Sequence, residues 1–67
     1  MPVAKVIELV GSSEKSFEDA IVEAVRRTSK TVRNITAVDV VGQKAVVKNG
    51  KVVQYRVNLK LAFGIED

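Results

Sequence analysis

The sequence predicts an α+β fold with the element order β-α-β-β, and two periodic patterns support that prediction. Between residues 52 and 63, apolar residues alternate with mostly polar ones, which is typical of a strand with one buried face. Between residues 17 and 32, apolar residues recur every three or four positions, which predicts an amphipathic helix of about four turns. Because one helix can cover only one face of a sheet, we expect a ligand or partner to meet the other face. The core-facing residues of the alternating strand are Val53, Tyr55, Val57, Leu59, Leu61 and Phe63.

The first strand is predicted over residues 3–10. Strand alternation would turn Ile7 and Leu9 toward the core and Glu8 away from it. The three small residues 11–13, Gly-Ser-Ser, are expected to end this strand before the helix begins.

The predicted helix has a capping signal and favourable charges at its start. The Ser16 hydroxyl can accept a hydrogen bond from a free amide of the first turn. Glu18 and Asp19 place negative charge at the positive end of the helix dipole. Glu23 and Arg27 are four residues apart, so we expect them to form a pair on the exposed side.

The second strand is predicted from Ile35 to about Lys48, with a bulge or bend at Gly42. Asn49-Gly50 then predicts a two-residue hairpin turn, because both central positions of a type I′ turn need positive φ.

Counting outward from this turn predicts which residues lie opposite each other in the hairpin. The predicted pairs that face away from the helix are Ala37 with Ala62, Asp39 with Lys60, Val41 with Asn58, and Gln43 with Arg56. The predicted pairs on the buried face are Val38 with Leu61, Val40 with Leu59, and Val46 with Val53.

The length and composition favour a single domain, residues 1–67, that is stabilised by assembly. A chain of 67 residues buries little surface and is marginal alone. It has no cysteine, so it forms neither disulfides nor thiolate metal sites. It also lacks histidine, which removes the commonest general base and the usual zinc ligand. We therefore expect a homo-oligomer.

Several functions are not expected from the sequence. The net charge of +3 is small, acidic residues are mixed among the basic ones, and aromatic residues are scarce, so nucleic acid is not an expected partner. No signal peptide or membrane-spanning stretch is visible, so the expected location is the cytoplasm. Without a histidine beside a serine, and without a glycine-rich phosphate loop, we do not expect an enzyme.

Three strings, in their order and spacing, resemble the dodecin family over nearly the whole chain. They are KVIELVGSSEKSF at 5–17, EDAI at 18–21 and YRVNLKLAF at 55–63. The resemblance implies a three-stranded antiparallel sheet wrapped partly around one helix, with twelve copies forming a hollow shell. It also implies a protein that sequesters small ligands, typically stacked pairs of flavins at subunit interfaces, and does not catalyse a reaction.

The sequence departs from the flavin-binding pattern of this family at both positions that matter. Where that pattern has a tryptophan that stacks on the flavin ring, this chain has Ala37, and it contains no tryptophan elsewhere. Where the pattern has a glutamine after the tyrosine of the last strand, this chain has Arg56, with Gln54 two residues before it. Stacking on an aromatic ring contributes about 1–3 kcal/mol in comparable cases. We therefore expect the flavin site to be degraded.

Other residues on the outer face suggest alternatives. Glu8, Asp39 and Asn58 offer the hard oxygen ligands that calcium prefers, if neighbouring copies complete a site. For Asp39, a cross-strand ion pair with Lys60 is favoured over a role as a metal ligand. Arg56 could bind a carboxylate across a subunit contact, or hold a phosphate or another anionic ligand.

These observations predict a non-catalytic, dodecameric shell protein that binds or stores a small ligand. The alternatives are a calcium-binding variant with metal sites at subunit interfaces, and a structural or interaction shell without ligand.

Overall fold

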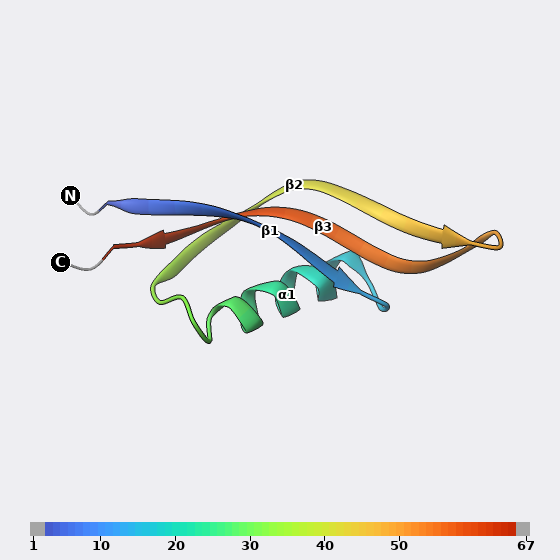
Figure 1. The fold of residues 1–67 in the computed structure, drawn as a ribbon, viewed down its shortest axis with the longest axis horizontal. Helices are drawn as coiled ribbons and strands as arrows, with labels where there is room; N and C mark the ends of the chain where they lie inside the picture. Colours follow the sequence, from blue (N-terminus) through green and yellow to red (C-terminus); the bar gives the residue numbers. More distant parts are fainter. Residues whose placement is uncertain (1–2, 66–67) are drawn as a thin grey trace.

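The computed structural model describes residues 3–65 and contains four elements in the predicted order (Figure 1). The strands form one antiparallel sheet in the order β1-β3-β2, so β3 is central and both other strands are edges. The helix lies against one face of this sheet and packs on β1 and β3. The predicted α+β fold is confirmed. The elements are β1 (Ala4–Ser13), α1 (Phe17–Thr28), β2 (Ile35–Lys48) and β3 (Lys51–Gly64).

The prediction that Gly11, Ser12 and Ser13 end the first strand is wrong, because β1 continues through all three residues. Gly11 pairs with Val57 of β3 in the regular antiparallel register. Its role is to let the helix approach: a Cβ at this position would lie 2.7 Å from the carbonyl oxygen of Ala20. The glycine therefore marks a close packing contact and not a turn.

The predicted helix start is confirmed, and its predicted length is wrong. The Ser16 hydroxyl accepts a hydrogen bond from the Asp19 amide at 2.9 Å. The helix has 12 residues, about three turns, and ends at Thr28. Beyond it, the Thr31 amide bonds to the carbonyl of Thr28 at 3.1 Å in a tight turn. Val32, which follows this turn, is half-buried. It therefore fits the apolar pattern of the helix although it lies beyond the end of the helix.

The predicted hairpin turn and the extent of β2 are confirmed. Asn49 and Gly50 have φ values of 52° and 74°, as a type I′ turn requires. β2 covers the predicted residues, and β3 includes the whole alternating segment.

The predicted hairpin register holds for Ala37–Ala62, Val38–Leu61, Asp39–Lys60 and Val40–Leu59, and fails in the middle of the hairpin. Of the three register shifts between β2 and β3, one lies between Ile35 and Ala37, outside this region, and the other two lie between Val40 and Gly42 and between Val46 and Val47. Val53 is the extra residue in β3 and Val41 the extra residue in β2, so the two shifts cancel. Between them, the observed pairs are Gly42 with Asn58, Gln43 with Val57, Lys44 with Arg56, Ala45 with Tyr55, and Val46 with Gln54.

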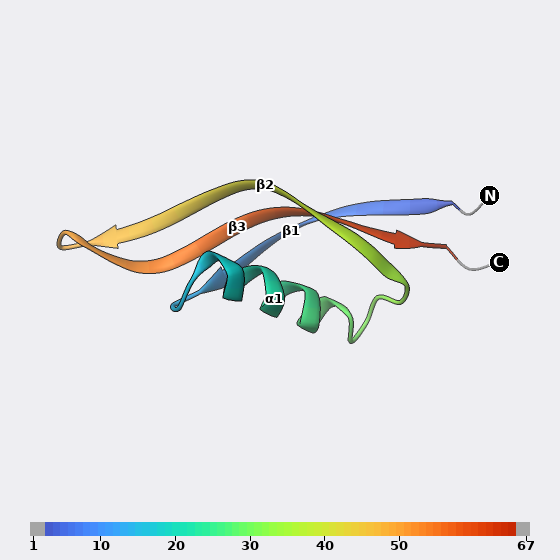
Figure 2. The ribbon, with the colours of Figure 1, turned by 180° about the vertical axis from the view of Figure 1, so that it is seen from behind.

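The chain is elongated and has a small core. Its radius of gyration is 13.7 Å, compared with about 11 Å for a compact chain of this length. The far end of the β2–β3 hairpin extends past the helix in both ribbon views (Figures 1 and 2). Within residues 3–65, the buried hydrophobic residues are Ala20, Val57, Leu59 and Leu61.

Apolar side chains outside this core remain exposed. Val40 was predicted to be buried, but it is 46% exposed because α1 packs on β1 and β3. Val53 is 41% exposed because it lies in the part of the hairpin beyond the helix. Such a surface is expected of a chain that completes its core by assembly. No helix in the part of the chain that the structure describes could span a membrane.

Candidate functional site on the outer face of the sheet

The face of the sheet turned away from α1, here called the outer face, carries the polar residues of the alternating pattern. Val57, Leu59 and Leu61 are buried toward the helix, so their alternating neighbours point outward. Because β1 and β2 both pair with β3, the outward residues of β3 from Arg56 to Ala62 have a neighbour on each side. These residues therefore form rows of three side chains across the sheet.

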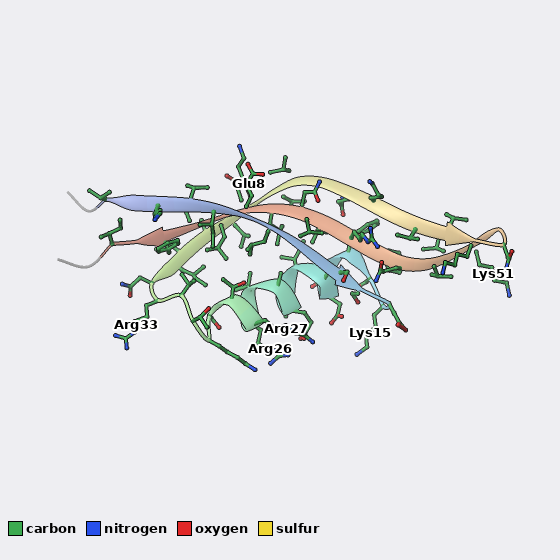
Figure 3. All side chains as sticks on the ribbon, in the orientation of Figure 1. Glu8, Lys15, Arg26, Arg27, Arg33 and Lys51 are labelled. Atoms are coloured by element: carbon green, nitrogen blue, oxygen red, sulfur yellow. The ribbon has the colours of Figure 1, made fainter. Side chains whose placement is uncertain are left out.

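One row places two carboxylates on either side of a lysine. Glu8 of β1 and Asp39 of β2 both pair with Lys60 of β3. Figure 3 shows Glu8 pointing away from the helix. Neighbouring strands lie about 4.8 Å apart, so the two carboxylate-bearing residues are about 10 Å apart at the backbone. Within residues 3–65, no ion pair joins Lys60 to either carboxylate, so the alternative of an Asp39–Lys60 pair is not formed in the single chain.

Asn58, in the next row, shares one shallow hollow with Glu8 of the Lys60 row. Asn58 pairs with Val10 on one side and with Gly42 on the other. The hollow has a volume of about 440 Å³ and is lined by Glu8, Leu9, Val10, Val41, Asn58, Leu59 and Lys60. Asp39 is not among the lining residues. Two of the three predicted oxygen ligands therefore share a hollow, and the third lies across Lys60 from them.

A complete metal site is not formed by one chain. Among residues 3–65, no group of three or more acidic, histidine or cysteine side chains is placed to hold a metal. Glu8 and Asp39 do, however, lie on the two edge strands of the sheet. Edge strands are where a neighbouring copy can approach, so each carboxylate is accessible to ligands from another subunit.

The row at Ala62 is flat and aliphatic. Ala62 pairs with Val6 on β1 and with Ala37 on β2, the position where the family resemblance places a stacking tryptophan. The aromatic side chains of the chain lie elsewhere. Phe17 and Tyr55 contact each other edge to face, with ring centroids 5.0 Å apart, and Phe63 is on the side of the sheet that faces the helix. The outer face thus has no ring on which a flavin could stack.

The row at Arg56 is basic, and it differs from the prediction. Lys44, and not Gln43, pairs with Arg56, because Val53 is an extra residue in β3 between the turn and Arg56 and shifts the pairing by one residue. The Nε of Arg56 donates a hydrogen bond to Oε1 of Gln54 at 2.9 Å. Sequence reasoning missed Lys44. Gly42 indicated an irregularity in β2, beside the bulge at Val41, but it did not indicate the extra residue at Val53.

The charged residues on the helix are separate from this face. Glu23 pairs mainly with Arg26, whose Nη2 lies 2.7 Å from its Oε1, and more distantly with Arg27 at 3.9 Å. The predicted pairing with Arg27 is therefore present but secondary. The hydrogen bond from Arg26 lowers the pKa of the Glu23 carboxyl, and burial opposes that effect.

Comparison with known proteins now gives the class of this protein. The profile of the Dodecin family matches residues 3–66, and the chain belongs to that family. Dodecins are non-catalytic proteins that bind small ligands and form homo-oligomers.

Three relatives illustrate the similarity. The chain is 36% identical to calcium dodecin from Mycobacterium tuberculosis over 94% of this chain and 89% of the relative. It is 35% identical to the dodecin of Thermus thermophilus over 97% of this chain and 94% of the relative. Its backbone matches the structure of the Streptomyces coelicolor dodecin with a TM-score of 0.94 at 32% identity, over 98% and 94% of the two chains.

A solved structure of the M. tuberculosis calcium dodecin, described as having a novel calcium-binding site, matches with a TM-score of 0.83 at 34% identity. That match covers 96% of this chain and 91% of the other. Sequence identity alone therefore does not separate the calcium relative from the other dodecins.

Proposed function

We propose that this dodecin assembles into a hollow shell of twelve copies that stores a small ligand on the outer sheet face, and that this ligand is calcium and not a stacked flavin pair. The observation that carries the proposal is the placement of Glu8 and Asp39 in one row on the two edge strands. Asn58 adds an amide oxygen in the hollow beside Glu8.

Calcium fits this arrangement only across a subunit contact. Calcium takes six to eight oxygen ligands, many more than Glu8, Asp39 and Asn58 supply in one chain. Lys60 lies between the two carboxylates and opposes a cation directly above it. A site at the sheet edges, built from one carboxylate of each of two neighbouring copies, keeps the ion away from that ammonium group. The similarity to a relative named calcium dodecin also supports this proposal.

The flavin alternative has less support. The row at Ala37 offers only small aliphatic side chains, so the stacking contribution of about 1–3 kcal/mol per ring is lost. Arg56 occupies the position at which the flavin-binding pattern has a glutamine that bonds to the flavin ring. Its Nε already donates a hydrogen bond to Gln54.

The first test of the proposal is the mass of the particle and its response to calcium. Size exclusion with light scattering should give a mass of twelve subunits and a peak without visible flavin absorbance. Thermal melting at fixed protein concentration should then shift upward with CaCl₂, and a chelator should reverse the shift. A ligand present at 100 times its Kd stabilises the folded state by about 2.7 kcal/mol per site.

Two variants and one control locate the calcium site. Glu8→Gln and Asp39→Asn keep the shape of each side chain and remove its charge, so each should lose most of the calcium shift. Glu14→Gln removes a carboxylate from the exposed turn between β1 and α1 and should keep the full shift. If all three variants respond as the parent does, calcium does not bind at this row. If calcium has no effect on the parent and no flavin is present, the proposal is wrong and a shell without ligand is favoured.

A further inference from the structure

The outer end of the β2–β3 hairpin carries positive charge without compensating negative charge. Lys44 lies directly opposite Arg56, and nearer the turn Lys48 lies directly opposite Lys51. Between residues 42 and 56 there are four basic residues and no acidic one, and all four are exposed. Like charges placed opposite each other on antiparallel strands are destabilising, so an anion held between them would relieve that repulsion.

The Arg56 side chain is oriented by a hydrogen bond to a neighbouring residue on this surface. Its Nε donates to Oε1 of Gln54 at 2.9 Å, which orients the guanidinium group. Both ion pairs found within residues 3–65 involve Glu23 on the helix, so neither Arg56 nor Lys44 is paired with a carboxylate there. An oriented guanidinium with free terminal N–H groups is suited to bidentate contact with an oxyanion.

A third donor completes the row at Arg56. Ser12 of β1 pairs with Arg56 on the side opposite Lys44, and it is exposed. Its neighbour Ser13 points to the helix side, where its hydroxyl donates to Asp19 at 2.6 Å, so Ser12 faces outward. A residue with a hydroxyl, one with a guanidinium and one with an ammonium group therefore lie side by side on three strands, whose backbones are spaced about 4.8 Å apart.

The two carboxylates of the Lys60 row are too far away to neutralise this row. Glu8 and Asp39 belong to the row of Lys60, which is four residues along β3 from Arg56. That separation is about 13 Å at the rise of a strand, which exceeds the Debye length of about 8 Å at physiological ionic strength.

We propose that Arg56 and Lys44, with Ser12 as an additional donor, form an oxyanion site that takes a phosphate group, either free or as part of a phosphoester. Gln54 is a positioning residue that orients Arg56. The site lies in a different row from the calcium proposal and does not depend on it. At this position of the sheet, the arginine recognises a negatively charged group. The glutamine of the flavin-binding pattern would instead bond to the neutral polar edge of a flavin ring.

The experiment is isothermal titration of the assembled protein with inorganic phosphate, AMP and adenosine, at an ionic strength held constant with NaCl. Phosphate and AMP should bind, and adenosine should not. Equal affinity for phosphate and AMP would indicate a site for the free anion, whereas tighter binding of AMP would indicate a phosphoester ligand. Arg56→Gln should weaken binding by about tenfold to a hundredfold, as expected when hydrogen bonds to a charged group are lost.

Two further variants separate a site from a general charge effect. Lys44→Gln should weaken binding by about tenfold, because it removes the opposite cation. Arg33→Gln makes the same chemical change as Arg56→Gln at the other end of the molecule, as its place in Figure 3 relative to Lys51 shows, and should leave binding unchanged. The proposal is overturned if phosphate does not bind, or if Arg33→Gln weakens binding as much as Arg56→Gln. It is also overturned if Arg56→Gln leaves phosphate affinity intact and only breaks up the assembly, because Arg56 would then serve a subunit contact.

Discussion

The substitution Gly11→Ala tests whether the helix rests directly on the backbone of β1. The added Cβ would lie 2.7 Å from the carbonyl oxygen of Ala20, 2.9 Å from the Cβ of Ala24 and 3.3 Å from Cγ2 of Val57. The first two contacts involve backbone and a rigid methyl group, neither of which can rotate away. The helix would have to move outward from a core in which Ala20 and Val57 are fully buried.

The size of the effect follows from two opposing terms. Overpacking a well-packed core costs about 1–3 kcal/mol. Replacing glycine by alanine also restricts the unfolded chain, which returns about 0.4–1 kcal/mol. We expect a net loss of about 1–2 kcal/mol, or roughly 5–15 °C in Tm for a chain of this length.

The chain offers a matched control for this prediction. Gly42 is also a strand glycine, but a Cβ there would meet only the Nδ2 of Asn58, at an ordinary 3.8 Å. Gly42→Ala should therefore be neutral or slightly stabilising. The assay is urea or thermal unfolding of both variants and the parent at one protein concentration, because the stability of an oligomer depends on concentration. Equal stability of Gly11→Ala and Gly42→Ala would refute the packing argument.

Two other changes probe the outer face and the helix. Ala37→Trp should create flavin binding, measured as quenching of flavin fluorescence, because it restores a stacking surface worth about 1–3 kcal/mol per ring; unchanged affinity would show that Ala37 is not at the flavin position. The pKa of Glu23 is lowered below 4.5 in the folded chain, so its ionised form adds stability above that pH, and this stability is lost as pH falls through the folded pKa. Glu23→Gln should therefore be less stable than the parent at pH 7, and the difference should disappear as the pH falls through the folded pKa; a difference that persists after Glu23 is protonated would contradict the assignment to Arg26.

The elongated hairpin leaves apolar surface of this chain uncovered. Beyond the helix, Val47, Val52 and Val53 are each at least 41% exposed, on an arm that the helix does not cover. A two-stranded ribbon is marginally stable alone, so this arm needs contacts outside its own chain. The small buried core and the exposed arm of the single chain are both consistent with a family whose members form homo-oligomers.

Features that depend on neighbouring residues were predictable from the sequence. The turn at Asn49 and Gly50 follows from the positive φ values that these residues tolerate, and the cap at Ser16 needs only an amide three residues away. Alternation in β3 determined which side chains face the core, because the period of a strand is set by backbone geometry. The outward position of Glu8 and Arg56 follows from the same rule.

Features that depend on contacts between distant segments were decided only by the tertiary structure. Gly11 looked like a turn residue, and it is a contact point because α1 packs back onto β1. The register of β1, which places Glu8 beside Lys60, is set by pairing with β3 and not by any local turn. The bulge at Val53 that brings Lys44 opposite Arg56, and the bulge at Val41 that restores the register, follow from how two strands fit together over their whole length. The sequence by itself therefore determined the elements and their faces, while the partners of each side chain on the outer face required the assembled sheet, because strand pairing joins residues that no local signal connects.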